Sequence, residues 1–314
     1  MKNIKLTFVA IATIAPLTGC ASPSALIKVR VIDEDGKPIN NVTSELINIY
    51  DYGTIVKGLT DKNGYYSDYK KNIFEVSGYF EKAGYYESRG IIWEAPTKWG
   101  DLPPANTNFI ITLKKIISPV PMTRRVVRTF LPRANEPIGF DMQKGDWIAP
   151  DGKGTYADVY FTGSFKYETR RNHELSVSSI FTNQFNGIQP FIASKISNNK
   201  KITSRLLPQH FAPETGFKPE IKLWQFNDPA RRFQRHTLEN RNYYFRVRTQ
   251  IDEKGKIISA NYGWIDGEII VDISNNQRII LHFDYYYNPD SQSRSLEPKE
   301  IADKQTKDLP KGEN

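Results

Sequence analysis

Apolar and polar residues alternate with period two in short runs along most of the chain, which is the pattern of half-buried strands. In the run 26–32, Ile27, Val29 and Val31 fall on one side, and two basic residues fall on the other. Turn residues rather than helical segments separate the later strand-like runs. These runs cover 158–165, 175–181, 243–250, 267–273 and 278–287. The pattern predicts a protein that is mainly β.

Two tight-turn signals lie in the first third of the chain, at Asp35-Gly36 and Asn63-Gly64, where residues that tolerate positive φ are placed between strands. We expect a first β domain over residues 25–115. Asp35, Asp61 and Asn63 carry oxygen atoms that could bind calcium. They lack the glutamate and the spacing of a calcium loop, so turn formation is the better interpretation.

Prolines at 103, 104, 119 and 121 separate this domain from a second β-rich domain, which we expect over residues 120–290. The run 243–250, the turn residues 252–256 and the returning run 257–262 predict a hairpin. A β-sandwich or jelly-roll-like domain fits these runs best. Residues 291–314 are polar and charged, and we expect a disordered tail.

The amino terminus has the layout of a secretory signal peptide over residues 1–19. Lys2 and Lys5 form a positive region, and an apolar run over 6–16 follows. That run is shorter than the ~20 residues that a membrane-spanning helix needs. Residues 20–24 would form a short tether.

The segment Leu17-Thr18-Gly19-Cys20 resembles the lipobox of bacterial lipoproteins. The resemblance implies that Leu17, Thr18 and Gly19 are recognised by a signal peptidase, and that Cys20 carries a diacylglyceryl group after cleavage. The alternative is an ordinary secretory signal followed by a chance cysteine. Cys20 is the only cysteine, so an intramolecular disulfide and a second thiol site are excluded. We therefore expect a protein anchored to a membrane through N-terminal lipid.

Ala21 and Ser22 follow the cysteine, with no aspartate at either position. This resembles lipoproteins that are sent to the outer membrane when the source has two membranes. We expect location in the cell envelope, and the side of the membrane that the body faces stays open.

The first domain also resembles a carboxypeptidase regulatory-like domain. The resemblance lies in Asp-Glu-Asp-Gly-Lys-Pro-Ile at 33–39, Thr-Asp-Lys-Asn-Gly-Tyr-Tyr at 60–66, and Ala83-Gly84-Tyr85. It implies a small transthyretin-like or immunoglobulin-like β-sandwich that serves as a spacer and has no peptidase chemistry. Segments such as 144–150 and 284–289 are similar to those of uncharacterised bacterial lipoproteins with the same two-part layout.

Charge and motifs exclude several function classes. The net charge is +8, but the arginine pairs are scattered and have acidic neighbours, so we expect no nucleic-acid partner. The four histidines form no metal-binding pair, and no Gly-x-Ser-x-Gly is present, so we expect no metal, no cofactor and no catalytic residue. The histidines are His173, His210, His236 and His282.

Two groups of residues keep other functions open. A hydrolase acting on envelope polymers would need two facing carboxylates, and the candidates are Asp141, Asp146, Asp151 and Asp158. A glycan-binding protein would need exposed aromatic rings, and the candidates are Trp93, Trp99, Trp147, Trp224, Trp264 and the run Tyr285-Tyr286-Tyr287. For each ring, packing in a core is the competing interpretation. The leading expectation is a non-catalytic, lipid-anchored interaction or scaffold protein, with an envelope protein or a glycan as its partner.

Overall fold

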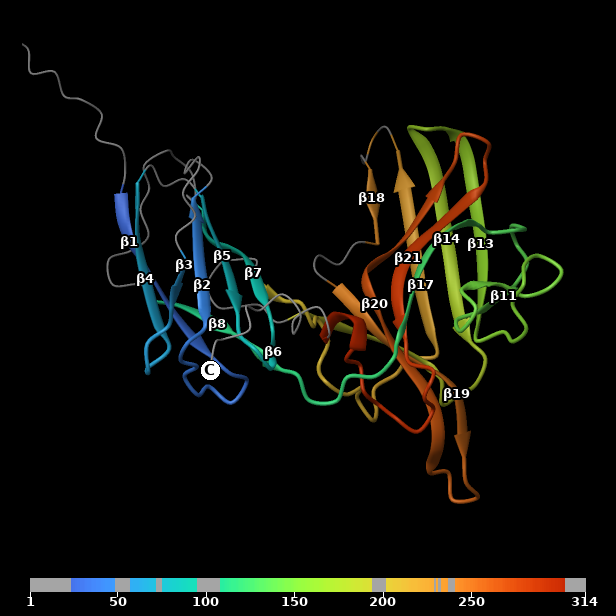
Figure 1. Cartoon of the computed structure of the whole chain (residues 1–314). Coiled ribbons are helices and arrows are strands. Elements are labelled where there is room, and N and C mark those ends of the chain that lie inside the picture. Colours follow the sequence, from blue (N-terminus) through green and yellow to red (C-terminus); the bar gives the residue numbers. More distant parts are fainter. Residues whose placement is uncertain are drawn as a thin grey trace, which may run out of the picture.

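The chain folds into two β-sandwiches that follow one another in sequence, as the alternating pattern predicted (Figure 1). The computed structural model describes residues 24–48, 57–71, 75–94, 108–193, 202–228, 230, 233–236 and 241–302. The signal segment, Cys20 and Trp99 lie outside these residues. No helix within the described ranges has the length and apolar character needed to cross a membrane.

The first sandwich packs a three-stranded sheet, ordered β4-β1-β8, against a five-stranded sheet, ordered β16-β7-β5-β2-β3. The strands are β1 (Ser24–Ile32), β2 (Thr43–Asn48), β3 (Lys57–Leu59), β4 (Tyr65–Lys71), β5 (Glu75–Glu81), β7 (Ser88–Glu94), β8 (Asn108–Thr112) and β16 (Thr203–Ser204). A short ribbon pairs β6 (Tyr85–Tyr86) with β9 (Lys114–Lys115). The alternation of β1 places Ile27, Val29 and Val31 in the core at 0% exposure.

The turn between β3 and β4 is built by backbone hydrogen bonds to a carboxylate. Asp61 Oδ1 accepts the NH groups of Asn63 and Tyr65, each at 2.8 Å. Gly64 has a φ of 78°, and a Cβ there would lie 2.4 Å from the carbonyl oxygen of Val31, so glycine alone fits. These contacts support the interpretation of Asp61 and Asn63 as turn residues rather than calcium ligands.

The second sandwich packs a five-stranded sheet, ordered β10-β21-β20-β19-β15, against a six-stranded sheet, ordered β12-β11-β13-β14-β17-β18. The first sheet contains β10 (Thr123–Phe130), β15 (Gly187–Ile192), β19 (Arg241–Ile251), β20 (Ile257–Ile273) and β21 (Ile279–Tyr287). The second contains β11 (Ile138–Asp141), β12 (Asp146–Trp147), β13 (Val159–Thr169), β14 (Asn172–Phe181), β17 (Glu220–Asn227) and β18 (Gln234–Arg235). The predicted hairpin is the pair β19 and β20.

The boundary between the sandwiches differs from the predicted division into 25–115 and 120–290. The short strand β16 lies in the second part of the sequence but pairs with β7 at the edge of the first sandwich. Ile202, next to it, is 2% exposed and packs in the core of the first sandwich. The chain of the second domain therefore returns to complete the first.

The prediction of a disordered tail is wrong for residues 291–302. Leu296 and Glu297 are 0% exposed, and residues 299–302 form one helical turn. Val120 forms a parallel bridge with Pro298. Polar composition alone misled here because the polar groups of this segment find partners within the protein. Residues 303–314 lie outside the described part.

A buried carboxylate joins the two sandwiches. Glu297 accepts hydrogen bonds from the Tyr86 hydroxyl at 2.9 Å and from the backbone NH groups of Ile117 and Ser118 at 3.0 and 3.1 Å. His210 Nδ1 lies 2.8 Å from the same carboxylate. Glu297 is the charged centre where the first sandwich, the linker and the second sandwich meet.

His210 extends this contact back to the first sandwich. Its Nε2 lies 2.7 Å from Glu34 Oε2, so the ring is held between two carboxylates. We call Glu34, Tyr86, His210 and Glu297 the junction cluster. Beside it, Lys114 Nζ donates to the carbonyl oxygen of Pro208 at 2.7 Å. The junction cluster therefore makes two contacts between the sandwiches: Tyr86 with Glu297, and Glu34 with His210.

The junction cluster is charged in the folded state. Burial alone would lower the pKa of His210, but the hydrogen bonds to Glu297 and Glu34 outweigh it and raise the pKa to about 9. Burial alone would raise the pKa of Glu297, but the hydrogen bonds from His210 and Ile117 hold it below its ordinary value. An imidazolium between two carboxylates follows.

The junction cluster should make stability depend on pH. Because the pKa of His210 is raised by folding from 6.5 to about 9, its contribution is complete below pH 6.5 and is lost as pH rises through 9. The contribution of Glu297 is complete above its unfolded pKa of 4.5 and is lost at lower pH. We expect His210→Gln to remove on the order of 1–3 kcal/mol at pH 6 and much less at pH 10.

Urea unfolding of wild type and His210→Gln across this pH range measures the difference. His282→Gln is the matched control, since that ring is about one third exposed and lies outside the junction. An equal difference between wild type and His210→Gln at both ends of the range would contradict the charged state of the junction cluster.

Candidate functional site

The four aspartates that could have formed a catalytic pair build loops instead. Asp141, at the end of β11, accepts the backbone NH of Thr155 at 3.0 Å, and Asp158 accepts that of Met142 at 2.9 Å. Arg248 lies between them, with Nη2 2.8 Å from Asp141 Oδ1 and Nε 3.0 Å from Asp158 Oδ1. Asp141 and Asp158 are 1% and 0% exposed. The carboxylates are brought together, but around an arginine.

The strand that supplies Arg248 is irregular at this point. The pairing of β19 with β20 shifts register between residues 247 and 250, and Arg248 itself has a φ of 54°. Such a bulge redirects a side chain, here toward the end of the sandwich. Burial alone would raise the pKa of Asp141, but the NH groups of Thr155 and Lys144 and the Arg248 guanidinium hold it below its ordinary value.

The other two aspartates are also engaged locally. Asp146 accepts the backbone NH of Trp147 at 2.8 Å and that of Lys153 at 2.9 Å. Asp151 forms an ion pair with Arg133, with Nη1 and Oδ1 2.5 Å apart. These contacts give all four aspartates a structural role in the loops around β11 and β12.

The histidines are dispersed through the fold. His210 belongs to the junction cluster, His282 lies 3.8 Å from Asp284 on β21, and His236 contacts the ring of Trp224. His173 is 7% exposed at the start of β14. Across the described ranges, no group of three or more His, Cys, Asp or Glu residues is placed to hold a metal ion.

Most of the candidate aromatic residues fill cores. Trp147 is 3% exposed in the second sandwich, and Trp264 is 1% exposed beneath residues of the 205–218 region and the 291–302 segment. Tyr285 and Tyr287 are also buried, and Trp93 packs against the first core. Trp224 is the described tryptophan that is more than one third exposed, at 38%.

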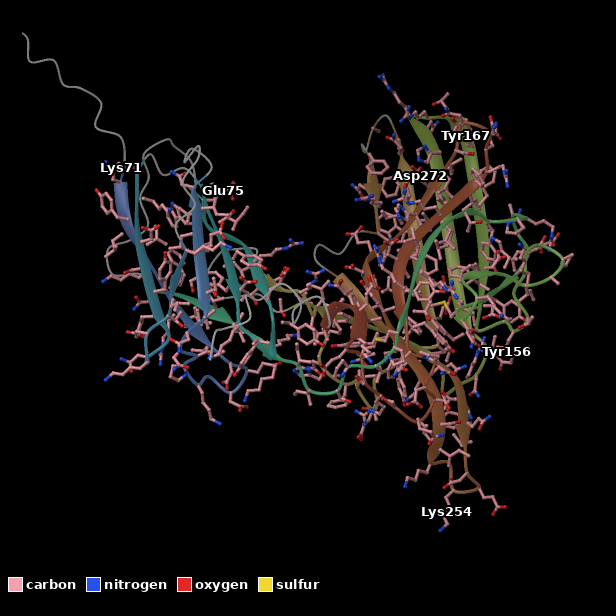
Figure 2. All side chains as sticks on the ribbon, viewed as in Figure 1. Lys71, Glu75, Tyr156, Tyr167, Lys254 and Asp272 are labelled. Atoms are coloured by element: carbon pink, nitrogen blue, oxygen red, sulfur yellow. The ribbon has the colours of Figure 1, made fainter. Side chains whose placement is uncertain are left out.

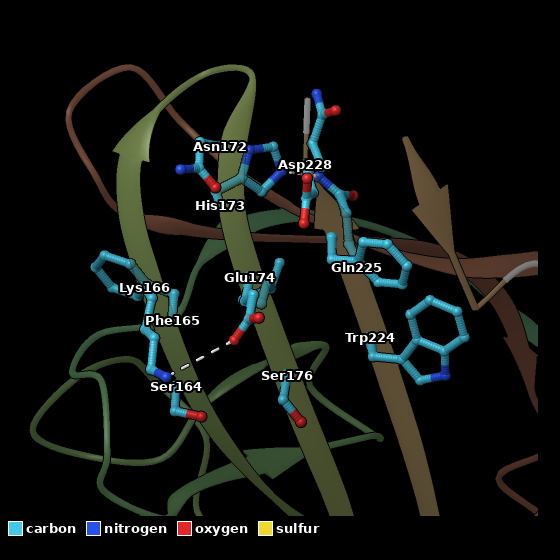
Figure 3. A pocket seen from close by; sticks show the side chains of 13 residues that line it. Ser164, Phe165, Lys166, Asn172, His173, Glu174, Ser176, Trp224, Gln225 and Asp228 are labelled. Carbon is cyan, nitrogen blue, oxygen red and sulfur yellow. Dashed lines mark hydrogen bonds and ion pairs between the residues drawn. The ribbon is translucent and has the colours of Figure 1, made fainter. Parts of the chain in front are cut away.

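Trp224 lies on the outer face of the six-stranded sheet, over a shallow depression of about 520 Å³ (Figure 3). Its ring stacks with that of Phe226, two residues along β17, with centroids 5.6 Å apart and planes 15° apart. The His236 ring lies beside the indole, with centroids 6.3 Å apart and planes 60° apart. The alternation of β17 produces this arrangement, because Leu223 and Gln225 point into the sandwich and leave the aromatic rings outside.

Short and charged side chains continue the face across the two neighbouring strands. Ser176 on β14 stands opposite Trp224, and Ser164 on β13 stands opposite Ser176. In the next row, Lys166 and Glu174 face each other with Nζ and Oε2 3.9 Å apart (Figure 3). We call Ser164, Lys166, Glu174, Ser176, Trp224 and Phe226 the Trp224 face.

A hydrogen-bond chain centred on the buried Gln225 and His173 side chains supports the Trp224 face from the other side of its sheet. The Gln225 amide nitrogen lies 2.9 Å from Asp272 Oδ1 and 3.0 Å from His173 Nε2. An amide nitrogen only donates, so His173 Nε2 is the acceptor of this bond. The His173 ring stacks on Tyr167 at 6.2 Å. This chain fixes β14 against β17 at one end of the depression.

Sequence reasoning named Trp224 but missed its neighbours. Ser164, Ser176, Lys166 and Glu174 are ordinary surface residues in the sequence, and only the register of three strands places them beside the indole. Ser164 and Ser176 fall within the predicted runs 158–165 and 175–181, which was the available signal, whereas Lys166 and Glu174 lie one residue outside those runs. The sequence did not indicate which strands pair with one another or in what register.

No family model matches the chain, and no match is found among curated proteins. Among solved structures, a streptococcal ancillary pilin is 9% identical with a TM-score of 0.19, and the match covers 82% of this chain and 58% of the pilin. A putative carbohydrate binding protein from Bacteroides uniformis is 15% identical with a TM-score of 0.20, covering 83% and 96%. At these scores the likeness carries no argument.

Removing Arg248 should destabilise the second sandwich strongly. Arg248→Leu would leave Asp141 and Asp158 buried without their cation, and we expect a loss of about 3–5 kcal/mol in the free energy of unfolding, measured with urea. Lys254→Met, at the exposed tip of the β19–β20 hairpin, is the control and should change stability by about 0.5 kcal/mol or less. A loss below about 1 kcal/mol for Arg248→Leu would contradict its role as the shared partner.

Proposed function

We propose that this chain is a lipid-anchored, non-catalytic envelope protein that binds a glycan through the Trp224 face. The observation that carries the proposal is the exposed Trp224–Phe226 pair beside a row of short polar side chains on an otherwise solvent-facing sheet. Large exposed aromatic residues on a polar surface are typical of binding sites.

The chemistry of the Trp224 face suits a sugar chain. The face of an aromatic ring attracts the partly positive C–H hydrogens on one side of a pyranose ring. The hydroxyls of Ser164 and Ser176 both donate and accept, which matches the hydroxyls at the rim of the same sugar. Lys166 and Glu174 largely cancel each other's charge, so the surface favours an uncharged polysaccharide over an acidic one.

The carboxylates in and near this face are held in ion pairs or hydrogen bonds, which supports binding rather than hydrolysis. The buried carboxylates Asp141 and Asp158 are saturated by Arg248 and backbone NH groups. Two carboxylates line the depression. Glu174 is paired with Lys166 and largely exposed, and Asp228 Oδ1 accepts the backbone NH of Ala230 at 2.7 Å. A glycosidase needs two carboxylates that face each other across the scissile bond, one of them acting as a proton donor.

The proposed anchor rests on the sequence around Cys20, which lies outside the described residues. Leu17-Thr18-Gly19-Cys20 would direct lipid to the thiol, and the first sandwich, with its resemblance to a carboxypeptidase regulatory-like domain, would act as a spacer. The junction cluster supports this division of roles, because it ties the spacer to the binding sandwich through buried contacts.

Loss of the indole should weaken polysaccharide binding. We expect wild-type protein to be retarded in gels containing a neutral polysaccharide, and Trp224→Ala to bind about three- to tenfold more weakly, since one aromatic contact contributes about 0.5–1.5 kcal/mol. Phe130→Ala is the matched control, because Phe130 is also 38% exposed in the same sandwich but lies on β10 in the other sheet. Trp224→Tyr should retain part of the affinity.

Two results would overturn the glycan proposal. One is the absence of retardation on every polysaccharide of a broad panel. The other is retardation of Trp224→Ala equal to that of wild type.

Lipidation should depend on the single cysteine. We expect cells grown with labelled palmitate to incorporate label into the full chain, and Cys20→Ala to remain unlabelled and to keep residues 1–19. Because no other cysteine exists, no second thiol can take up label in the variant. An unlabelled wild-type protein would contradict the anchor.

A further inference from the structure

The outer face of the three-stranded sheet in the first sandwich is aromatic, apolar and basic. While β1 turns Ile27 and Val29 into the core, it turns Leu26 outward at 49% exposure. Tyr69 on β4 stands directly opposite Leu26 and is 57% exposed. Ile110 on β8, at 40% exposure, continues the same side of the sheet.

The charged residues on this side are all cations. Lys28 and Arg30 alternate with Leu26 along β1, and Lys71 follows Tyr69 on β4. The outward positions of β1, β4 and β8 hold no carboxylate. The Arg30 guanidinium lies 5.6 Å over the ring of Tyr65. We call Leu26, Lys28, Arg30, Tyr65, Tyr69 and Lys71 the anchor-side face.

This face begins where the chain leaves Cys20. Ser24 starts β1 and pairs with Lys71, and Figure 2 shows Lys71 at the end of the first sandwich, far from Lys254 at the hairpin tip of the second. Four residue steps separate Cys20 from Ser24, so even a fully extended chain spans about 14 Å between them. A lipid on Cys20 would therefore keep Leu26 and Tyr69 close to the headgroups.

We propose that the anchor-side face lies against the membrane and binds anionic lipid headgroups; this rests on the lipid anchor proposed above. Tyrosine rings favour the boundary between headgroups and acyl chains, where one end is apolar and the other is wet. Lysine and arginine close to an anionic surface each strengthen binding, and acyl anchors commonly act with such a second signal. The face supplies both kinds of side chain next to the anchor.

The contact would fix how the body stands on the membrane. A short tether alone leaves the first sandwich free to rotate about Cys20. Contact through Leu26, Tyr69 and the three cations would select one orientation. Because the junction cluster ties the second sandwich to the first, the same contact would set the direction in which the Trp224 face points.

Vesicle co-sedimentation tests the contact without the lipid on Cys20. The assay uses the protein from Ala21 to Asn314, which contains every residue that the structure describes. We expect it to sediment with vesicles of phosphatidylcholine and phosphatidylglycerol, to bind pure phosphatidylcholine weakly, and to be released by salt.

Matched variants separate the face from the rest of the surface. Lys28→Gln with Lys71→Gln should lower the partition coefficient by about fivefold for each charge removed. Leu26→Ser with Tyr69→Ser should lower it as well. The control is Lys254→Gln with Ile258→Ser, which removes one cation and a side chain of 53% exposure from the far hairpin and should leave binding unchanged. Equal urea midpoints show that the variants are folded.

The outcomes distinguish this inference from the proposed function. No sedimentation with anionic vesicles, or equal loss in the control variant, would overturn the membrane contact. So would a stable dimer in sedimentation velocity that Leu26→Ser with Tyr69→Ser dissociates, because the face would then be covered by a second copy. Palmitate labelling of the full chain decides the anchor separately. If the full chain takes up label but the protein that starts at Ala21 fails to bind anionic vesicles, only the membrane contact is wrong.

Discussion

The structure depends on keeping one buried carboxylate ionised. Glu297 is fully buried, and an unpaired charge there would cost several kcal/mol. It is stabilised because donors converge on it from three parts of the chain: Tyr86 in the first sandwich, the linker at Ile117 and Ser118, and His210. If any of these segments moved away, the buried Glu297 carboxylate would lose a hydrogen-bond donor that stabilises its charge. The two sandwiches are therefore linked by a buried ionic contact as well as by a peptide connection.

Much of the fold was predictable, because a strand with one buried side has apolar residues at every second position of the sequence. The runs at 243–250 and 278–287 are strands close to those bounds, and Asn63-Gly64 is the turn it was expected to be. The order of the connections was not predictable in the same way. Tyr86 and Glu297 are 211 residues apart, and β16 completes a sheet that begins far upstream. Local sequence patterns do not indicate such distant pairings. For this reason the boundary between the sandwiches and the order of residues 291–302 were predicted incorrectly.

The site was predictable only in part, for a related reason. Alternation shows that Trp224 and Trp264 each lie on one side of a strand, but it does not show whether that side is covered. Trp264 is buried because the 205–218 region and the 291–302 segment lie across its sheet, whereas Trp224 keeps 38% of its surface exposed within the described part of the chain. In the same way, four aspartates close in sequence suggested a catalytic pair. A bulge in β19 instead brings Arg248 between two of them.

The most direct test of the account is whether the two sandwiches unfold as one body. Scanning calorimetry of the chain from Ala21 to Asn314 at pH 6 measures this, with Glu297→Ala as the comparison. We predict one cooperative transition for the wild type and two separated transitions for Glu297→Ala, since the variant loses the shared carboxylate but keeps both cores. Two transitions in the wild type at this pH would contradict the claim that the junction cluster makes a single unit of the two sandwiches.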